Sequence, residues 1–387
     1  MNGSVICMKI MTAMYTLKKG GSYDRFVMML EAFLEKGCHV HCLSLTPIVI
    51  NHALYSNHVV PHPFRIRNGF VTRATVLLLF PFYLLVMGWR EKIDLIVAFG
   101  PLYASLQTLS KWVLRRPMVT LIRSDLSSDT GMRRRHRGYK VLNKIMDRIG
   151  IGSSDRIIVN NQATQKEIIA VVCNPKKDEV KVLFNNIPSI PRVSEEDILH
   201  VRTRFGIPKE GKFVVTAGVL TRGKNFEVLL KCFPYIEVAS LFLAIIGDGS
   251  TKADARYVDE LARLTRTLDL GKKVIFPGWV EKEELWKIFG AADLVILPSL
   301  KEGMPNVLLE ALGCDIPCLG SNIPGIRDIL RHETLMFDPD DDKGLTEKLR
   351  RFFSDEDYRR RIMQLCYEQR ETFSFDWKER VFAVVTQ

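Results

Sequence analysis

The chain has 387 residues, of which 47% are hydrophobic and 26% are charged. This composition is typical of a soluble globular protein and excludes a disordered or fibrous chain, and the length suits two domains better than one core. Residues 1–190 contain 26 basic and 12 acidic side chains, a net charge of +14, whereas residues 191–387 contain 29 and 32, a net charge of −3. The basic first half would attract phosphate groups, anionic lipid or nucleic acid.

Apolar runs typical of strands alternate with amphipathic runs typical of helices along the whole chain. In the first half we expect strands at 5–11, 40–45, 94–99, 117–122, 156–159 and 180–184, with a glycine-containing loop at 18–22 and a helix at 23–36. The polar, proline-containing stretch 188–195 is the best linker candidate. In the second half we expect strands at 213–217, 241–246, 274–276, 294–297 and 317–320. Such alternation predicts two doubly wound α/β domains with parallel sheets and a ligand between the domains.

An apolar run at 76–87, interrupted by Pro81, raises the question of membrane contact. The run is shorter than the about 20 residues that a helical span needs. Arg65, Arg67 and Arg73 precede it, and Arg90 and Lys92 follow it. The run is either a buried core helix or an apolar patch that dips into a membrane surface. Because the surrounding half is basic, we favour a membrane contact by segment 65–92.

The stretch 294–312 carries the most specific pattern of the chain. A buried strand ends at Pro298, and a loop leads through Gly303 to Pro305, where the sequence predicts the first turn of a helix. The exposed amides of such a turn make a ready site for an anionic group. If the helix ran through both Glu302 and Glu310, their carboxylates would lie about 10–12 Å apart and could hold the two ends of an elongated ligand. The alternative is a solvated Glu302 and a helix-face Glu310 beside an ordinary helix start.

This E-x7-E pattern, Glu302 to Glu310 within EGMPNVLLEAL, resembles the motif of family 4 of the retaining glycosyltransferases, in glycosyl transferases group 1. Other stretches are similar to the family in the same order along nearly the whole chain: KKGGSYDRFVMMLEAFLEKGCHVHCLSL, SSDRIIVNN, VKVLFNN, AGVLTRGKNFEVLL, LAIIGDGS, VIFPGWVEKEEL, SNIPGIRDIL and FSFDWKERV. The resemblance implies a GT-B fold, in which two Rossmann-like domains face a central cleft. It implies an acceptor-side domain at 1–188, a nucleotide-sugar domain at 189–368 and a closing helix at 369–387 that returns to the first domain.

The resemblance also implies roles for individual residues. Lys224 would neutralise the diphosphate as it leaves, Glu302 would contact the donor sugar, and Glu310 would bind the ribose hydroxyls. The backbone or side chains of further residues would complete the donor site: Gly20, Gly21, Gly278, Gly303, Met304, Pro305 and Asn306. Charge builds up on the diphosphate as the bond to the sugar breaks, so a cation and oriented amides at that point lower the barrier. In the family the departing phosphate itself takes the acceptor proton, so no protein nucleophile is expected.

Two positions depart from the family pattern. Val219 stands where the family usually has an arginine, and Arg222 in the same loop is expected to reach the diphosphate instead and to join the catalytic set. Arg123 stands where the family has a histidine, and with Asp125 it is expected to handle the acceptor or the donor sugar. These departures keep a second hypothesis open: a catalytically impaired GT-B protein that binds nucleotide or lipid as a partner subunit.

The strongest local cluster of positive charge contains Arg133, Arg134, Arg135 and Arg137. It is either a solvated loop or a site for a polyprenyl-linked phosphate or for the headgroups of an anionic membrane leaflet. No RNA-binding motif with interleaved aromatic residues accompanies it, so we expect no nucleic-acid partner.

No metal or cofactor is expected. The acidic run 338–342 contains a D-x-D spacing, but it lies in a polar loop before a helix and is interpreted as a helix start. The sequence thus predicts a metal-independent hexosyltransferase that uses a UDP- or GDP-linked sugar. Its expected acceptor is a lipid-linked precursor or a surface polysaccharide such as O-antigen or capsule. The expected location is peripheral, on the cytoplasmic face of the membrane.

Overall fold

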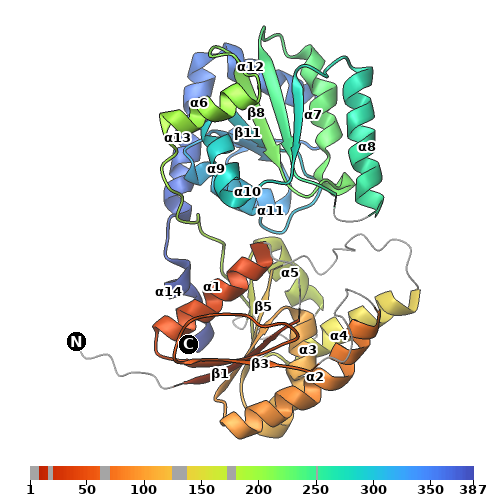
Figure 1. Ribbon diagram of the computed structural model, residues 1–387, viewed down its shortest axis with the longest axis vertical. Coiled ribbons are helices and arrows are strands. Elements are labelled where there is room, and N and C mark those ends of the chain that lie inside the picture. The colour runs from red at the N-terminus through yellow and green to blue at the C-terminus, as the bar shows by residue number, and fades with distance from the viewer. Residues whose placement is uncertain (1–7, 16–20, 62–69, 124–136, 172–179, 250–251) are drawn as a thin grey trace, which may run out of the picture. The chain divides into compact units, whose positions relative to one another are not determined.

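The computed structural model describes residues 8–15, 21–61, 70–123, 137–171, 180–249 and 252–387. The chain divides into two compact units (Figure 1), one formed by Met1–Phe184 with Asp376–Gln387 and the other by Asn185–Phe375. Residues 183–194 form neither helix nor strand, so the first crossing between the units lies in an irregular segment next to the predicted linker.

The first unit contains a seven-stranded sheet in the order β3-β2-β1-β4-β5-β6-β7, and all its neighbouring strands are parallel. Its strands are β1 (Lys9–Met14), β2 (His39–Ser44), β3 (Tyr55–Val59), β4 (Leu95–Phe99), β5 (Met118–Ile122), β6 (Arg156–Val159) and β7 (Val180–Val182). The central strands are buried on both faces, as expected where helices cover both sides of a sheet. The order reverses between β1 and β4, which is the mark of a doubly wound sheet.

The helices of the first unit lie on the two faces of this sheet (Figure 1). They are α1 (Gly21–Glu35), α2 (Phe70–Glu91), α3 (Pro101–Leu114), α4 (Arg137–Ser153), α5 (Gln162–Val171) and α14 (Trp377–Thr386). α3 packs against both α2 and α4, whereas α1 packs against α14. Right-handed connections that run in opposite directions from β1 place their helices on opposite faces, which explains this separation.

The second unit contains a six-stranded parallel sheet in the order β10-β9-β8-β11-β12-β13. Its strands are β8 (Lys212–Ala217), β9 (Leu241–Ile246), β10 (Val274–Gly278), β11 (Leu294–Leu297), β12 (Cys318–Ser321) and β13 (Met336–Phe337). Its helices are α6 (Glu195–Arg204), α7 (Phe226–Cys232), α8 (Lys252–Thr267), α9 (Lys282–Gly290), α10 (Asn306–Gly313), α11 (Pro324–Leu330), α12 (Asp342–Ser354) and α13 (Glu356–Phe373), with short 3-10 turns at Arg222–Lys224, Phe233–Tyr235 and Glu333–Leu335. The prediction of two doubly wound, Rossmann-like domains is confirmed.

The last helix belongs to the first unit although it follows the second in sequence. Phe382 lies 6.4 Å from Phe33 of α1, measured between ring centroids, and Lys378 forms ion pairs with Glu31 and Glu35 of the same helix. Trp377 is 1% exposed. The predicted closing segment 369–387 therefore contains the end of α13, a break at 374–376 and α14.

Candidate active site in the second unit

The loops that carry the predicted catalytic residues meet at the carboxyl edge of the second sheet. Lys224 follows β8 and Glu302 follows β11, and these neighbouring strands are where the strand order reverses. In doubly wound folds such a switch point opens a crevice beyond the strand ends and is the usual ligand site. The fold alone thus directs attention to the edge that the sequence motif also marks.

Lys224 and Glu302 form an ion pair, which is the central contact of the site. Ser299 is fully buried and donates a hydrogen bond of 2.7 Å from its Oγ to Glu302 Oε1. The backbone N–H of Leu300 donates to the carbonyl of Gly223, so the two loops are also joined through their main chains. The Ser299 hydrogen bond and the main-chain bond between the loops both keep the pair in place. The pair is only partly exposed, at 21% for the lysine and 11% for the glutamate side chain.

Two glycines let the lysine lie against the backbone. Gly218 directly follows β8 with φ of +155°, and a Cβ there would be 3.4 Å from Lys224 Cε. Gly247, after β9, has φ of +135°, and its Cβ would lie 1.9 Å from the carbonyl oxygen of Gly218. A side chain at Gly247 would therefore displace the loop that positions Lys224. The backbone N–H of Gly247 also bonds the carbonyl of Gly278, whose φ is +78°, so the predicted base-side turn is tied to the same edge.

The motif helix starts later than the sequence suggested. Pro305 has extended backbone angles and precedes α10, which begins at Asn306, so the prediction that Pro305 lies in the first helical turn is wrong. Glu302 lies in the loop and only Glu310 lies on the helix, so the premise that one helix runs through both is wrong as well. The early residues of the motif instead follow the loop from β11, and no side chain caps the start of α10. The first amides of this helix are therefore left for another partner.

Three motif residues have structural contacts that the sequence did not indicate. Met304 is 7% exposed, and its Sδ lies 3.1 Å from the backbone N–H of Asn185. Asn306 Oδ1 accepts a hydrogen bond of 2.8 Å from Asn185 Nδ2. The backbone of Gly303 lies close to Gly325 of α11, because a Cβ on Gly325 would lie only 2.0 Å from the Gly303 carbonyl oxygen. The loop is thus clamped between α11 and the start of the unit.

The other predicted donor residues have separate positions. Arg222 does not join Lys224 and Glu302, because it forms an ion pair with Glu260 of α8 and lies over the ring of Tyr257 at 5.6 Å. Val219 is 38% exposed. Glu310 is 7% exposed on α10, so its carboxylate is not on the solvated surface.

The predicted residues of the first unit are only partly described. Gly21 begins α1 and Arg137 begins α4, while Gly20, Asp125, Arg133, Arg134 and Arg135 lie outside the described residues. Arg123, at the end of β5, lies 5.8 Å from the ring centre of Phe99 and 5.9 Å from that of Trp377. Burial, and after it the nearby Arg25, lower the pKa of Arg123 to about 9. In this structure Arg123 is a half-buried cation that lies against two aromatic rings.

The acidic run 338–342 is a helix start, as predicted. Asp341 is the N-cap of α12, and its carboxylate accepts a hydrogen bond of 2.9 Å from the backbone N–H of Gly344. Asp338 accepts another of 2.9 Å from the backbone N–H of Asp340. Both carboxylates stabilise the turn that begins the helix.

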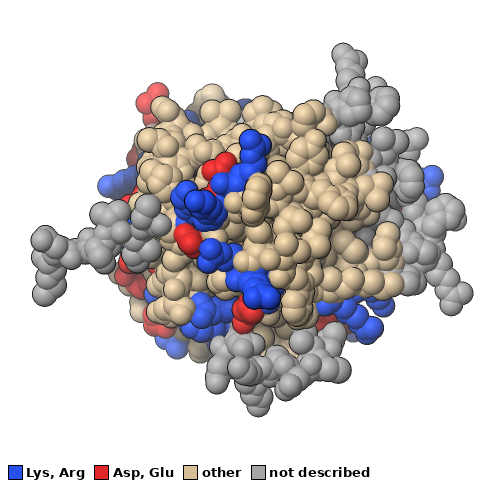
Figure 2. Space-filling view, turned by 90° about the horizontal axis from the view of Figure 1, so that it is seen from below, with Lys and Arg blue, Asp and Glu red and all other residues tan. Residues whose placement is uncertain are grey.

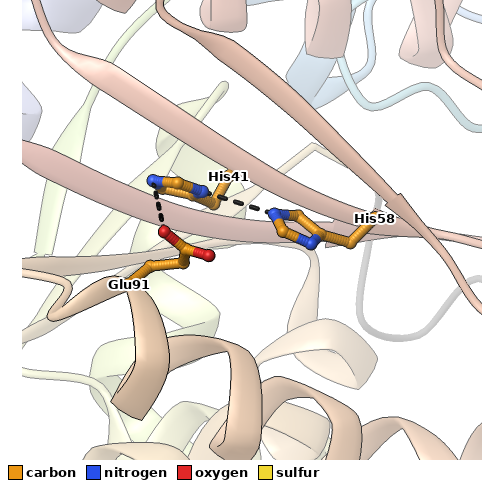
Figure 3. Close-up of side chains that lie close together, drawn as sticks. All are labelled: His41, His58 and Glu91. Carbon is orange, nitrogen blue, oxygen red and sulfur yellow. Dashed lines mark hydrogen bonds and ion pairs between the residues drawn. The ribbon is translucent and has the colours of Figure 1, made fainter.

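Among the described residues, one group of His and Glu side chains lies close enough together for a metal ion: His41 on β2, His58 on β3 and Glu91 at the end of α2 (Figure 3). His41 Nδ1 is 3.3 Å from His58 Nε2, and His41 Nε2 is 4.0 Å from Glu91 Oε2. The ring of His41 therefore lies between its two neighbours and turns a different nitrogen to each. Because a metal ion takes one nitrogen of a ring, this geometry is that of a hydrogen-bonded bridge rather than a converging ligand set.

Ser299, Gly218 and Gly247 are not among the site residues predicted from the sequence. Ser299 follows Pro298 at the end of a buried strand, and polar residues at the carboxyl ends of parallel strands are a usual signal of a ligand site. Gly218 and Gly247 each follow a buried strand directly. A glycine in that position is a signal of close approach that deserved more weight.

The residues that form this site lie in a segment that matches a family model of known proteins. The model is described as "Glycosyl transferases group 1" and covers residues 197–368, a span that includes Lys224, Glu302 and Glu310. Residues 197–368 thus resemble a glycosyl transferases group 1 domain, and this segment is called the group 1 domain below. The domain lies within the second unit, and the switch-point site lies within the domain.

The relatives of this group 1 domain are themselves glycosyltransferases. The chain is 29% identical over 192 residues to the uncharacterized glycosyltransferase MJ1607 of Methanocaldococcus jannaschii, a match over 49% of this chain and 47% of that protein. It is 22% identical over 244 residues, 62% of each protein, to the N-acetylgalactosamine-N,N'-diacetylbacillosaminyl-diphospho-undecaprenol 4-alpha-N-acetylgalactosaminyltransferase of Campylobacter jejuni. The matches thus span less than two thirds of these relatives' own lengths.

The fold of the whole chain is that of GT-B glycosyltransferases. The structure of Anabaena Alr3699/HepE in complex with UDP-glucose superposes with a TM-score of 0.75, covers 98% of this chain and 99% of that one, and shares 17% sequence identity. At this identity the likeness establishes the fold alone. The likeness covers both units, whereas the group 1 match covers residues 197–368.

Proposed function

We propose that the protein is a metal-independent, retaining glycosyltransferase that moves a sugar from a nucleotide diphosphate sugar to an acceptor. The observation that carries the proposal is the Lys224–Glu302 pair at the switch point of the group 1 domain, beside the uncapped start of α10. A diphosphate needs a cation and free amides, and a donor sugar needs a carboxylate that accepts its hydroxyl protons. All three are supplied there by neighbouring loops.

In this proposal Lys224 binds the diphosphate and stabilises the charge that develops as the bond to the sugar breaks. Glu302 exchanges part of its contact with the lysine for hydroxyls of the sugar, while Ser299 keeps its carboxylate in place. Glu310 binds the ribose, and Gly278 borders the base. Arg222, paired with Glu260, acts on the diphosphate only if that pair opens. The departing phosphate takes the acceptor proton, which leaves the configuration of the sugar retained without a protein nucleophile.

We further propose a UDP- or GDP-linked donor and an acceptor that is a lipid-linked precursor or a surface polysaccharide. The UDP-glucose complex of the structural neighbour supports a uridine donor. The Campylobacter relative, whose name specifies a diphospho-undecaprenol substrate, supports a lipid-linked acceptor. The net charge of +14 in residues 1–190 supports work at the anionic, cytoplasmic face of a membrane.

The experiment is thermal unfolding with a panel of nucleotide sugars, with Mg²⁺ or with a chelator, on the wild type, Lys224→Ala and Lys231→Ala. Lys231 is an exposed lysine on α7 and serves as the matched control. We expect one donor to raise the melting temperature equally with and without metal, in the wild type and the control. In Lys224→Ala the stabilisation should shrink, and sugar transfer should fall by a factor on the order of 10²–10³.

Three results would count against the proposal. If no nucleotide sugar raises the melting temperature, the proposed donor site is refuted. Stabilisation that requires Mg²⁺ would contradict metal independence. Donor binding without hydrolysis or transfer to any acceptor would favour the partner-subunit hypothesis, for which Val219 and Arg123, at positions where the family has other residues, are the supporting features.

A further inference from the structure

The outer face of α2 is apolar although it is exposed. Six side chains along it are between 40% and 72% exposed: Leu78, Leu79, Phe82, Tyr83, Val86 and Trp89. At about 100° per residue they fall within one arc of about 140°. Val76, Phe80 and Leu84, on the opposite side, are at most 1% exposed and form part of the core. A helix on the surface of a globular protein normally turns polar residues to solvent, so its second apolar side needs a partner.

The exposed apolar surface continues onto α3. Trp112 is 68% exposed and Val113 is 57% exposed near the end of that helix. The two helices are in close contact, because a Cβ on Gly88 would lie 2.7 Å from Leu114 Cδ1. Trp89 and Val113 line one open pocket of about 690 Å³. The six residues of α2, with Trp112 and Val113, are named the apolar face below.

Four exposed cations border the apolar face at one end: Arg90, Lys92, Arg115 and Arg116. Arg90, Lys92 and Arg116 line the same pocket as Trp89. No acidic side chain within the described part of the chain forms an ion pair with any of the four. Figure 2, which views the molecule from below, shows basic side chains gathered beside a broad area without charged side chains. An apolar surface with aromatic residues next to unpaired cations is complementary to the interface of an anionic bilayer.

We propose that the apolar face of α2 and α3 inserts into the interface of an anionic membrane while Arg90, Lys92, Arg115 and Arg116 contact lipid phosphates. Tryptophan suits this position because its ring is apolar and its N–H finds partners among the headgroups. The described residues include no helix that is both long and apolar enough to cross a bilayer. The inference deepens the proposed function and rests on it for the location at a membrane.

A second copy of the chain is a poorer occupant of this surface. A symmetric dimer through the apolar face would bring the same four cations of both copies to one interface. Like charges brought together at an interface oppose association. No acidic side chain in the described part of the chain forms an ion pair with any of these four cations. Anionic headgroups remove this conflict, because they supply the opposite charge along the whole border.

The test is sedimentation of the full chain with vesicles of phosphatidylcholine and phosphatidylglycerol at low salt. Phe82→Glu with Trp89→Glu removes the apolar contact, and Arg90→Glu with Arg116→Glu removes the charge contact. Tyr235→Glu, at an aromatic residue that is 67% exposed in the second unit, and Lys272→Glu with Lys273→Glu are the matched controls. We expect both test variants to lose at least about tenfold in vesicle partitioning and both controls to match the wild type.

A second measurement uses vesicles with brominated acyl chains, which quench tryptophan fluorescence near the hydrocarbon. Quenching should fall in Trp89→Phe and Trp112→Phe but not in Trp279→Phe, which is 64% exposed in the second unit. The inference is overturned if the wild type ignores anionic vesicles, if the Phe82→Glu, Trp89→Glu variant binds them normally, or if the face mediates a dimer instead.

Donor-induced stabilisation separates this inference from the proposed function. Variants of the apolar face that lose vesicle binding should keep the wild-type thermal shift with the donor, because Lys224, Glu302 and Glu310 lie in the second unit. Vesicle binding without any donor response would leave the membrane contact standing and refute the glycosyltransferase proposal.

Discussion

Gly325 brings the backbone of α11 closer to the carbonyls of Glu302 and Gly303 than a residue with a Cβ would allow. Gly325 lies inside α11, so alanine there suits the helix itself, yet its Cβ would sit 2.0 Å from the Gly303 carbonyl oxygen. We therefore expect Gly325→Ala to push the Glu302 loop away from Lys224 and to lower the apparent donor affinity by about tenfold or more, as small misplacements in active sites do. Titration of the donor by calorimetry measures the change.

Gly152 provides the control for this substitution. It lies in α4 and a Cβ there would meet nothing within 4 Å, so Gly152→Ala should raise stability by about 0.5–1 kcal/mol and leave donor affinity unchanged. Equal donor affinities in Gly325→Ala and the wild type would show that the loop tolerates the shift.

At this scale the sequence predicts the types of residue but not their partners. The motif and the charge chemistry single out Lys224 and Glu302, and the structure pairs them. The contacts of Met304 and Asn306 with Asn185 cannot be anticipated, because they join residues 119 and 121 positions apart that have no periodic relation. The role of Arg123 toward a substrate stays a prediction, and its contact with Trp377, from a helix at the far end of the chain, has no signal in the sequence.

The bridge of His41, His58 and Glu91 joins two strands and a helix, and it couples the stability of these elements to pH. Burial lowers the pKa of His41 below its usual 6.5, and His58 adds to this, while Glu91 opposes it. The unfolded chain therefore takes up a proton at His41 before the folded chain does as the pH falls below 6.5. By linkage, this residue lowers the free energy of unfolding over that window and has no effect on it well above pH 6.5.

His41→Gln should remove this pH dependence. Urea unfolding at about pH 7.5 and about pH 5.5 should show that the wild type loses more stability on acidification than the variant. His200→Gln, at an exposed histidine of α6, is the control and should behave as the wild type. A loss on acidification that is the same in His41→Gln as in the wild type would contradict the assignment.

The elements themselves are predicted best where burial is simple. Strands buried on both faces, such as β4 and β11, give continuous apolar runs and are found within a residue or two. β3 is missed because it is an edge strand with the polar sequence YSNHV, and β13 because it has only two residues. For residues 76–87 the sequence left two interpretations open, a core helix or an apolar surface patch. In the structure α2 has both features, because one apolar side is buried in the core and the other is exposed.

At the scale of the molecule, α14 should be essential to the first unit and dispensable for the second. Removing residues 376–387 uncovers Phe33 and breaks the ion pairs of Lys378 with α1. Limited proteolysis of this truncated chain should cut first within residues 8–184, while the segment 185–375 survives and the group 1 domain still binds its donor. Lys378→Ala, which removes the ion pairs alone, is the milder control, and uniform cleavage across both units would contradict the expectation.

The alternation of strands and helices predicts the architecture of both units, since it reflects burial that recurs along the whole chain. The route of the chain is a different matter. Which unit α14 joins is decided by a few contacts such as that between Phe33 and Phe382, and these have no local signature.

The return of α14 also sets an order for biosynthesis. A ribosome makes residues 377–386 only after all of the second unit, so the nascent first unit lacks one of its helices for as long as the second is being translated. Domains usually fold as they emerge, with the earliest first. Here the later unit is the first to have its full set of elements, and until then the side of α1 that carries Phe33 is open to chaperones and to misassociation.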